Sequence, residues 1–368
     1  MTSDPSPDRR SAVLVAGLVS FTLLGAGQAV MGPALPVFQH SFAISTATSG
    51  WLISALGIGS FLGLVGMYLY GSHISPRMAL TGMAAGAAGV ALAPDLALAL
   101  MGAVIFGAGY GAIAAIFNVR VLSAFGRKGP SMVSLLNAAY SVGAIVAPLV
   151  FVALGSRPSM VFWIIAAAAA ATILIVGGPG VAQHAAPVGR TGFRLHLPIL
   201  GFGLIGAGIE VCLGGLGPSA LIRAGVKPDH AAELLSVFFI AFLASRLVLA
   251  LIADRVPPFA IYTGAVFFTG LCGLCSALFD PAIAFPVTGL SAGLLFPGYF
   301  VTAAAKMGND SRVAPVILAT AQIGAVATPL FVAQLIPGMG ERGFFWMLTA
   351  LSAAATLMAL GFYRQMTR

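Results

Sequence analysis

The stretch SVGAIVAPLVF, residues 141–151, is nearly repeated far down the chain as QIGAVATPLFV, residues 322–332. The paired glycines Gly143 and Gly324 are separated by 181 residues (324 − 143). The phrase GAG recurs at the same separation, beginning at Gly25 and again at Gly206 (206 − 25). Two phrases that repeat in one register indicate a duplicated half, because chance composition would not hold the register constant.

The composition is that of a membrane protein. The 368 residues are 59% hydrophobic and only 8% charged, and the mean hydropathy is +1.02. A helical span needs about 20 apolar residues, and the runs are long and do not alternate as barrel strands do. We therefore predict an all-α membrane protein with twelve transmembrane helices, at about residues 12–38, 47–71, 78–94, 97–124, 131–155, 158–178, 197–223, 231–253, 258–279, 282–308, 313–336 and 343–363.

The net charge of +8 is explained by its placement. With a cytoplasmic N-terminus, the basic residues outside the spans concentrate in cytoplasmic loops, and four fall on the outer side: Arg157, Arg223, Lys227 and Arg342. This bias follows the positive-inside rule and predicts a multi-pass protein of the inner (plasma) membrane with both termini cytoplasmic. The basic residues therefore indicate orientation against the bilayer, and we predict no nucleic-acid partner.

The longest connector, GGPGVAQHAAPVGRTGFRLH at residues 177–196, separates six spans from six. It is rich in Gly and Pro, as linkers are. We predict an N-terminal six-helix bundle at 1–180, a cytoplasmic linker at 181–195 and a C-terminal six-helix bundle at 196–368. Because six is even, the two halves are parallel repeats related by an axis along the membrane normal.

A loop signature stands in the second half: in SRLVLALIADRVPP, Arg246 is followed eight residues later by Asp254 and then Arg255. This signature resembles that of the major facilitator superfamily. The first-half copy, GMYLYGSHISPR, has His73 in the register of Asp254 and lacks the acidic anchor. The resemblance implies the major facilitator fold, a central cavity lined by spans 1, 4, 7 and 10, and a cytoplasmic latch formed by Arg246, Asp254 and Arg255.

Other segments resemble the fucose-permease branch of sugar transporters: GPALPVFQHSF after span 1, FNVRVLSAFGRKGPSMVSLLNAAYSVGA across spans 4 and 5, and LLFPGYFVTAAA in span 10. That branch carries a carboxylate in span 1 and another in span 4. The matching stretches here, GQAVMGPALP and GAIAAIFN, contain none. Either the coupling acid has moved or the chain is not a proton symporter of that type.

Glu210 is the acidic residue that falls at mid-depth in a predicted span, and it lies one residue past the position of Gln28 in the duplicated GAG phrase. A charge at the bilayer centre costs about 2.5 to 3.5 kcal/mol on insertion scales, so such a residue is a functional candidate. As a functional group it would exchange protons near neutral pH or accept a hydrogen bond from substrate. As a structural group it would pair with Arg246 or fix helix packing. Arg246 itself is either a latch residue or a substrate contact.

Uncharged polar residues are distributed over the spans of both halves, including the cavity spans 1, 4 and 10. Amides donate and accept hydrogen bonds, and aromatic faces stack on the C–H surfaces of sugars. Each is individually explained by packing, but the set favours a neutral polar solute: Gln28, Trp51, Asn118, Asn137, Tyr140, Tyr299 and Gln322. Prolines interrupt helical hydrogen bonding, and three are candidate hinges: Pro148, Pro297 and Pro329.

These observations predict a secondary active transporter that moves a small polar, sugar-like solute by alternating access, as a monomer in the lipid bilayer. H⁺ is the candidate coupling ion, and no enzymatic activity, metal or other cofactor is expected. Transport driven by ATP is not expected either, because no phosphate-binding loop is present. One alternative is a proton-driven exporter of drugs or hydrophobic metabolites. Such exporters carry G-P-x-x-G-G in span 5, where this chain has APLVF at 147–151. The other alternative is a non-transporting membrane receptor or scaffold.

Overall fold

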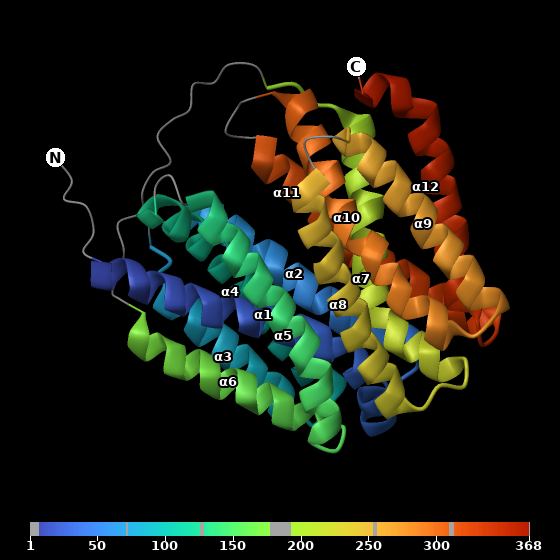
Figure 1. Cartoon of the computed structure of the whole chain (residues 1–368). Coiled ribbons are helices and arrows are strands. Elements are labelled where there is room, and N and C mark those ends of the chain that lie inside the picture. The colour runs from blue at the N-terminus through green and yellow to red at the C-terminus, as the bar shows by residue number, and fades with distance from the viewer. Residues whose placement is uncertain are drawn as a thin grey trace. The chain divides into compact units, whose positions relative to one another are not determined.

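The computed structural model describes residues 7–70, 73–125, 129–176, 193–252, 256–308 and 313–367. All regular structure in these ranges is helical (Figure 1). The predicted all-α class is therefore confirmed. The first six helices are α1 (Pro7–Phe42), α2 (Thr46–Tyr70), α3 (Pro76–Leu92), α4 (Leu96–Phe125), α5 (Gly129–Ala153) and α6 (Pro158–Ile175). The others are α7 (Leu197–Arg223), α8 (Pro228–Ile252), α9 (Pro258–Leu278), α10 (Pro281–Met307), α11 (Val313–Leu335), the 3₁₀ helix η2 (Ile336–Met339) and α12 (Gly343–Thr367).

The chain forms two compact units. The first comprises Met1–Ala43 and Ala55–Ala182, and the second comprises Ile44–Ser54 and Gln183–Arg368. The second unit thus includes the first turns of α2, where the Ser54 hydroxyl donates to the Val326 carbonyl of α11 at 2.8 Å. The predicted linker, 181–195, lies outside the described residues except for its last three.

Helix pairing repeats from one unit to the other. In the first unit α1 packs on α5, and α3 packs on both α4 and α6. In the second unit α7 packs on α11, and α9 packs on both α10 and α12. Since each helix is replaced by the one six places later, the two units share one internal arrangement.

Backbone contacts fix the register in which the helix pair α2 and α4 is repeated as the pair α8 and α10. Gly107 is so close to the carbonyl of Leu56 that a Cβ would overlap it, and Gly289 lies in the same way against the carbonyl of Phe238. Both members of the contact are shifted by 182 residues (289 − 107 and 238 − 56). Small residues allow such close helix approach in membranes.

Eleven helices among the described residues are long and apolar enough to cross a membrane. The sequence predicted twelve spans, and the helix not counted among the eleven is α3. It has only 17 residues, a length of about 26 Å at 1.5 Å per residue. Proline and capping groups set its start: Pro76 occupies the first turn, and the Ser75 hydroxyl accepts a hydrogen bond from the Met78 amide at 3.2 Å. Such caps satisfy amides that the helix itself leaves free.

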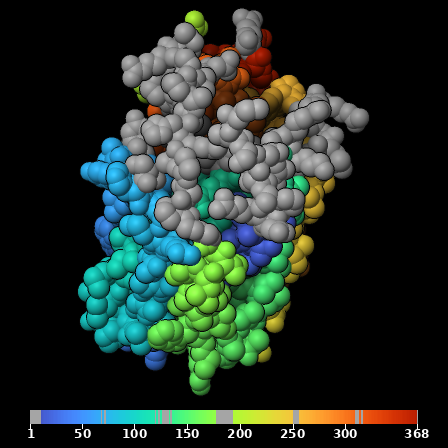
Figure 2. All heavy atoms as spheres, turned by 90° about the vertical axis from the view of Figure 1, so that its left-hand side faces the viewer, coloured from blue at the N-terminus to red at the C-terminus, as the bar shows by residue number. Residues whose placement is uncertain are grey.

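Large apolar side chains cover the outer faces of the bundles. On α6, Leu174 is 84% exposed, and Trp163 and Ile164 are also exposed. Figure 2 views this side of the first unit, where α6 lies beside α3 at the surface. Extended exposed apolar surface of this kind requires a non-aqueous surrounding, which agrees with an integral membrane protein.

The three candidate hinge prolines lie inside helices. Pro148 is in α5, Pro297 is in α10 and Pro329 is in α11. Each helix continues past its proline, so these residues remove internal hydrogen bonds without ending the span. Their role as hinges stays a prediction.

Candidate functional site

Glu210 is the central residue of α7, which runs from Leu197 to Arg223. Its carboxylate is directed toward α8, where the Glu210 Oε1 atom lies 4.0 Å from the Arg246 Nη2 atom. Each of the two side chains is 26% exposed. The sequence-predicted acid and its predicted structural partner therefore lie together in the second unit, and both are partly exposed.

Two further contacts hold the Arg246 guanidinium. Its Nε atom donates to the carbonyl of Gly293 on α10 at 3.2 Å. Its Cζ atom lies 4.3 Å from the centre of the Phe242 ring, one helical turn earlier on α8. A guanidinium over an aromatic face is attracted by the ring quadrupole. The side chain is thus held by one hydrogen bond and one ring contact, in addition to the glutamate.

The close approach of α8 and α10 brings the Gly293 carbonyl within reach of Arg246. A Cβ on Gly293 would overlap the Ser245 hydroxyl. That hydroxyl is itself bonded to the Phe242 carbonyl at 2.9 Å. Glycine at 293 is therefore required for the helix spacing that positions Arg246.

The Glu210–Arg246 separation is longer than a direct hydrogen bond, which is about 2.7–3.2 Å for N–H···O. The two groups attract each other electrostatically without forming a fixed hydrogen-bonded pair. In the described part of the chain, Arg246 has no hydrogen-bond partner other than Gly293. The arrangement can therefore accommodate a proton on Glu210 without breaking a hydrogen bond to Arg246.

The first unit holds an uncharged counterpart of this pair. The Tyr110 hydroxyl of α4 donates to the Gln28 side-chain oxygen of α1 at 3.0 Å. Gly143 lies against the Thr22 carbonyl as Gly324 lies against the Leu204 carbonyl.

The glycine contacts of Gly143 and Gly324 make Thr22 of α1 and Leu204 of α7 equivalent positions, and these are 182 residues apart (204 − 22). In this register Glu210 takes the place of Gln28 itself (210 − 28), and the one-residue offset inferred from the GAG phrase disappears. Equivalent positions on α1 and α7 thus carry an amide in one unit and a carboxyl in the other.

The structure places the other predicted residues in varied surroundings. Tyr299 is buried, and its hydroxyl donates to the Ile317 carbonyl at 3.1 Å, which ties it to packing between α10 and α11. The side-chain oxygen of Asn118 on α4 is buried and has no hydrogen-bond partner among the described residues. Asn137 and Trp51 are exposed, while Tyr140 and Gln322 are half-buried. The remaining members of the predicted latch, Asp254 and Arg255, lie outside the described residues.

Sequence reasoning missed Tyr110, Phe242 and the carbonyl of Gly293. An aromatic residue four positions before an arginine on one helix is a detectable pattern, because residues i and i+4 are neighbours on a helix surface. Phe242 could have been found in this way. The backbone carbonyl could not, since nothing in its residue type marks it as an acceptor.

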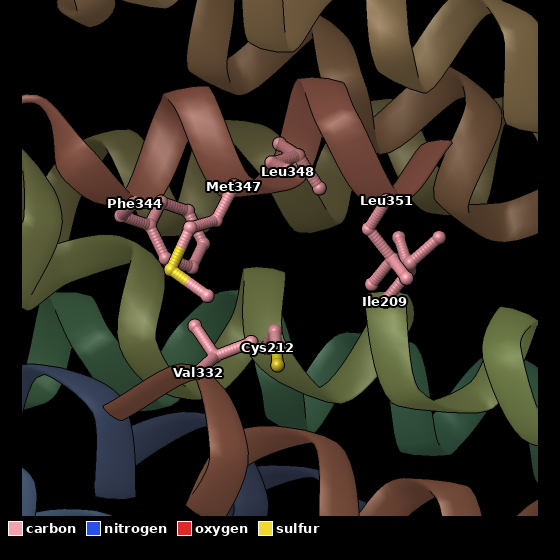
Figure 3. Close-up of a pocket in the computed structure, with 7 residues that line it drawn as sticks. All are labelled: Ile209, Cys212, Val332, Phe344, Met347, Leu348 and Leu351. Atoms are coloured by element: carbon pink, nitrogen blue, oxygen red, sulfur yellow. The ribbon is translucent and has the colours of Figure 1, made fainter. Parts of the chain in front are cut away.

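A separate apolar hollow lies on another face of α7 (Figure 3). Ile209 and Cys212 of α7 line it with Val332 of α11 and Phe344 of α12. These side chains offer little for a polar solute to bind. The hollow is therefore a packing gap between helices and is not part of the Glu210–Arg246 site.

The family model described as Major Facilitator Superfamily matches residues 17–316. Among curated proteins, none shows a significant sequence match. A solved structure of the nucleoside transporter NupG has a TM-score of 0.76 at 14% identity, covering 98% of this chain and 99% of its own. A D-xylose–proton symporter has a TM-score of 0.74 at 15% identity, with coverages of 96% and 97%.

A bacterial homologue of the human lysosomal transporter Spinster has a TM-score of 0.72 at 14% identity, with coverages of 99% and 98%. At these identities the likeness shows a shared fold, and it supports the predicted superfamily without testing the fucose-permease branch. The match over most of the chain, the helical fold and the repeated arrangement of two six-helix sets agree. The chain therefore belongs to the Major Facilitator Superfamily and is a membrane transporter rather than an enzyme.

Proposed function

We propose that the chain is a secondary active transporter that moves a small polar solute across the inner membrane by alternating access, with Glu210 as the proton-coupling carboxyl. The observation that carries this proposal is the Glu210–Arg246 pair. Glu210 lies at the middle of α7, and its Oε1 atom is 4.0 Å from the Nη2 atom of Arg246 on α8. About a quarter of each side chain is exposed. A titratable group held near a fixed positive charge inside a transmembrane segment is a candidate for proton relay.

A polar pair in the first unit supports a hydroxylated solute. Gln28 is oriented by Tyr110, which donates to its side-chain oxygen. The amide nitrogen of Gln28 is then a donor for a solute oxygen. Two proteins of similar fold are described as a nucleoside transporter and a D-xylose–proton symporter, and both of those solutes carry a pentose. A sugar-like solute is therefore the first candidate.

The purified full chain should be screened by thermal unfolding against neutral sugars, sugar acids, nucleosides, amino acids and lipophilic cations. A ligand that binds the folded state raises its stability by mass action. Compounds that stabilise the chain should then exchange across vesicles containing it, and not across empty vesicles. Stabilisation by lipophilic cations alone would favour an exporter, whereas binding without any exchange would favour a receptor or scaffold.

We expect both termini to be cytoplasmic in a monomeric protein, because of the charge bias and because the twelve predicted spans, with the short helix α3 counted among them, are an even number. Tags at both ends should be accessible to protease in inverted inner-membrane vesicles and protected in intact spheroplasts. A tag placed in the outer loop around Lys227 is the matched control and should show the reverse pattern. Opposite accessibility of the two termini would mean an odd span count and would contradict the parallel repeat.

A further inference from the structure

We propose that the transported solute carries a carboxylate, which binds the Arg246 guanidinium in competition with Glu210. This inference rests on the proposed transport function and adds the chemical class of its solute. It concerns the Glu210–Arg246 site of the second unit alone.

The Arg246 guanidinium is held in place, but not all of its hydrogen-bond donors have partners among the described residues. Its Nε atom donates a hydrogen bond to the Gly293 carbonyl at 3.2 Å, and the Phe242 ring covers one face of the guanidinium. The two terminal nitrogens form no hydrogen bond with the described residues, and the side chain is 26% exposed. A guanidinium presents its donors as a planar fork that matches the two oxygens of a carboxylate. The available part of Arg246 therefore fits a carboxylate better than a neutral hydroxyl.

The neighbouring acid does not hold the guanidinium by a hydrogen bond. Oε1 of Glu210 stops 4.0 Å from Nη2, which is beyond direct hydrogen-bond distance. When Glu210 is ionised, it is the counter-ion of Arg246 and repels a second carboxylate. When Glu210 is protonated, Arg246 has no counter-ion and the solute can supply one.

The net charge of the Glu210–Arg246 site favours an acidic solute over a neutral one. The empty site, with ionised Glu210 and Arg246, has no net charge. The loaded site, with protonated Glu210, Arg246 and one solute carboxylate, also has none. A neutral solute carried with a proton would instead leave an uncompensated positive charge within the span, which is costly. A phosphate dianion would leave a net negative charge, so the balance favours a monocarboxylate over a phosphate ester.

No other ionisable group in the described parts of the neighbouring helices supplies this balance. On α8, Asp229, His230 and Glu233 lie in the first turns, and His230 pairs with Glu233 at 3.1 Å. Helix α11 has no charged residue. The remaining groups of α7, α10 and α12 are Arg223, Lys306 and Arg364 in the last turns, the buried Cys212 and Tyr299, and Tyr363 near the end of α12. Among the described residues, competition at Arg246 is thus confined to Glu210 and the solute.

The test uses matched pairs of compounds with one carbon skeleton: gluconate with glucose, galactonate with galactose and xylonate with xylose, with glucose 6-phosphate as the phosphate arm. We expect at least one acid to raise the unfolding temperature of the full chain while its neutral partner does not. The affinity of that acid should rise as the pH falls, because protonation of Glu210 removes the competitor. Glu210→Gln should bind it with little pH dependence.

Arg246→Lys keeps the charge but lacks the fork, so we expect the affinity for the acid to fall about 10- to 100-fold, the range of a charge-assisted hydrogen bond. Arg342→Lys is the matched control. Its guanidinium donates to the Ala277 carbonyl at 3.0 Å, away from Glu210, and the acid should bind this variant as it binds the wild type. In wild-type vesicles, uptake of the acid with one proton should not depend on membrane potential, a readout that needs no variant.

The inference is overturned if no acid stabilises the chain more than its neutral partner does, if glucose 6-phosphate is preferred, or if Arg246→Lys binds the acid as well as Arg342→Lys does. Transport of a neutral partner in those cases would leave the proposed function standing. Failure of both members of every pair to exchange across vesicles would contradict the proposed function itself.

Discussion

Glu210→Gln is expected to abolish solute accumulation driven by a pH gradient, reducing it to the level of empty vesicles, while counterflow exchange continues. Glutamine keeps the size of the side chain and most of its hydrogen bonding, but it cannot take up or release a proton. Exchange at equal pH needs binding and reorientation only, whereas accumulation needs the proton. Uptake with and without an imposed gradient, in vesicles of equal protein content, measures both quantities.

Glu233→Gln is the matched control for this change. Glu233 lies in the first turns of α8, is about half exposed and pairs with His230, so its replacement should leave accumulation unchanged. If accumulation, pH dependence and affinity are all unaltered in a stable Glu210→Gln protein, Glu210 has no part in coupling.

A purely structural Glu210–Arg246 pair predicts a different result. Removing one partner of a partly buried pair leaves the other charge uncompensated. Glu210→Gln would then lower thermal stability, and adding Arg246→Gln would restore part of it. A double variant that is less stable than either single variant would exclude this explanation.

Gly293→Ala is expected to have the second largest effect, on both stability and transport. The new Cβ would overlap the Ser245 hydroxyl and crowd the Phe242 carbonyl, so α10 must move away from α8. Overpacking of this kind costs about 1–3 kcal/mol. The Gly293 carbonyl accepts a hydrogen bond from the Arg246 Nε atom at 3.2 Å. The same movement takes this carbonyl away from Arg246. The unfolding temperature should fall, and exchange should fall with it.

Gly264→Ala on α9 is the control, because nothing lies within 4 Å of a Cβ built at that position. Alanine is a better helix former than glycine by about 1 kcal/mol in soluble hosts, so this variant should be as stable as the wild type or slightly more. Equal behaviour of the two variants would show that the α8–α10 approach does not position Arg246.

The helices could be predicted from the sequence because their apolar runs are long and uninterrupted. The span predicted at 197–223 coincides with α7, whereas α1 runs from Pro7 to Phe42, beyond the predicted 12–38. Hydropathy marks the apolar segment, but a helix continues for as long as its backbone geometry and hydrogen bonding allow. The repeat was also predictable, since it follows from the register of glycines that permit close helix contact.

The site could be predicted only in part. Glu210 was identifiable because an acid is rare in such a span, but whether it faced Arg246 depended on the rotation of α7 against α8. Helices that are apolar all round carry little information about which face meets which neighbour. For the same reason the sequence could not show that Tyr299 is buried with its hydroxyl bonded to the Ile317 carbonyl, or that Gly293 supplies an acceptor to Arg246.

The central claim is that solute and proton move together through this chain. Its most direct test follows the pH inside vesicles containing a trapped pH-sensitive dye, after an inward gradient of a transported solute is imposed at equal starting pH. We predict that the interior acidifies in wild-type vesicles, and that it does not acidify in empty vesicles or in those containing Glu210→Gln. Entry of the solute into wild-type vesicles without any change in interior pH would contradict the claim.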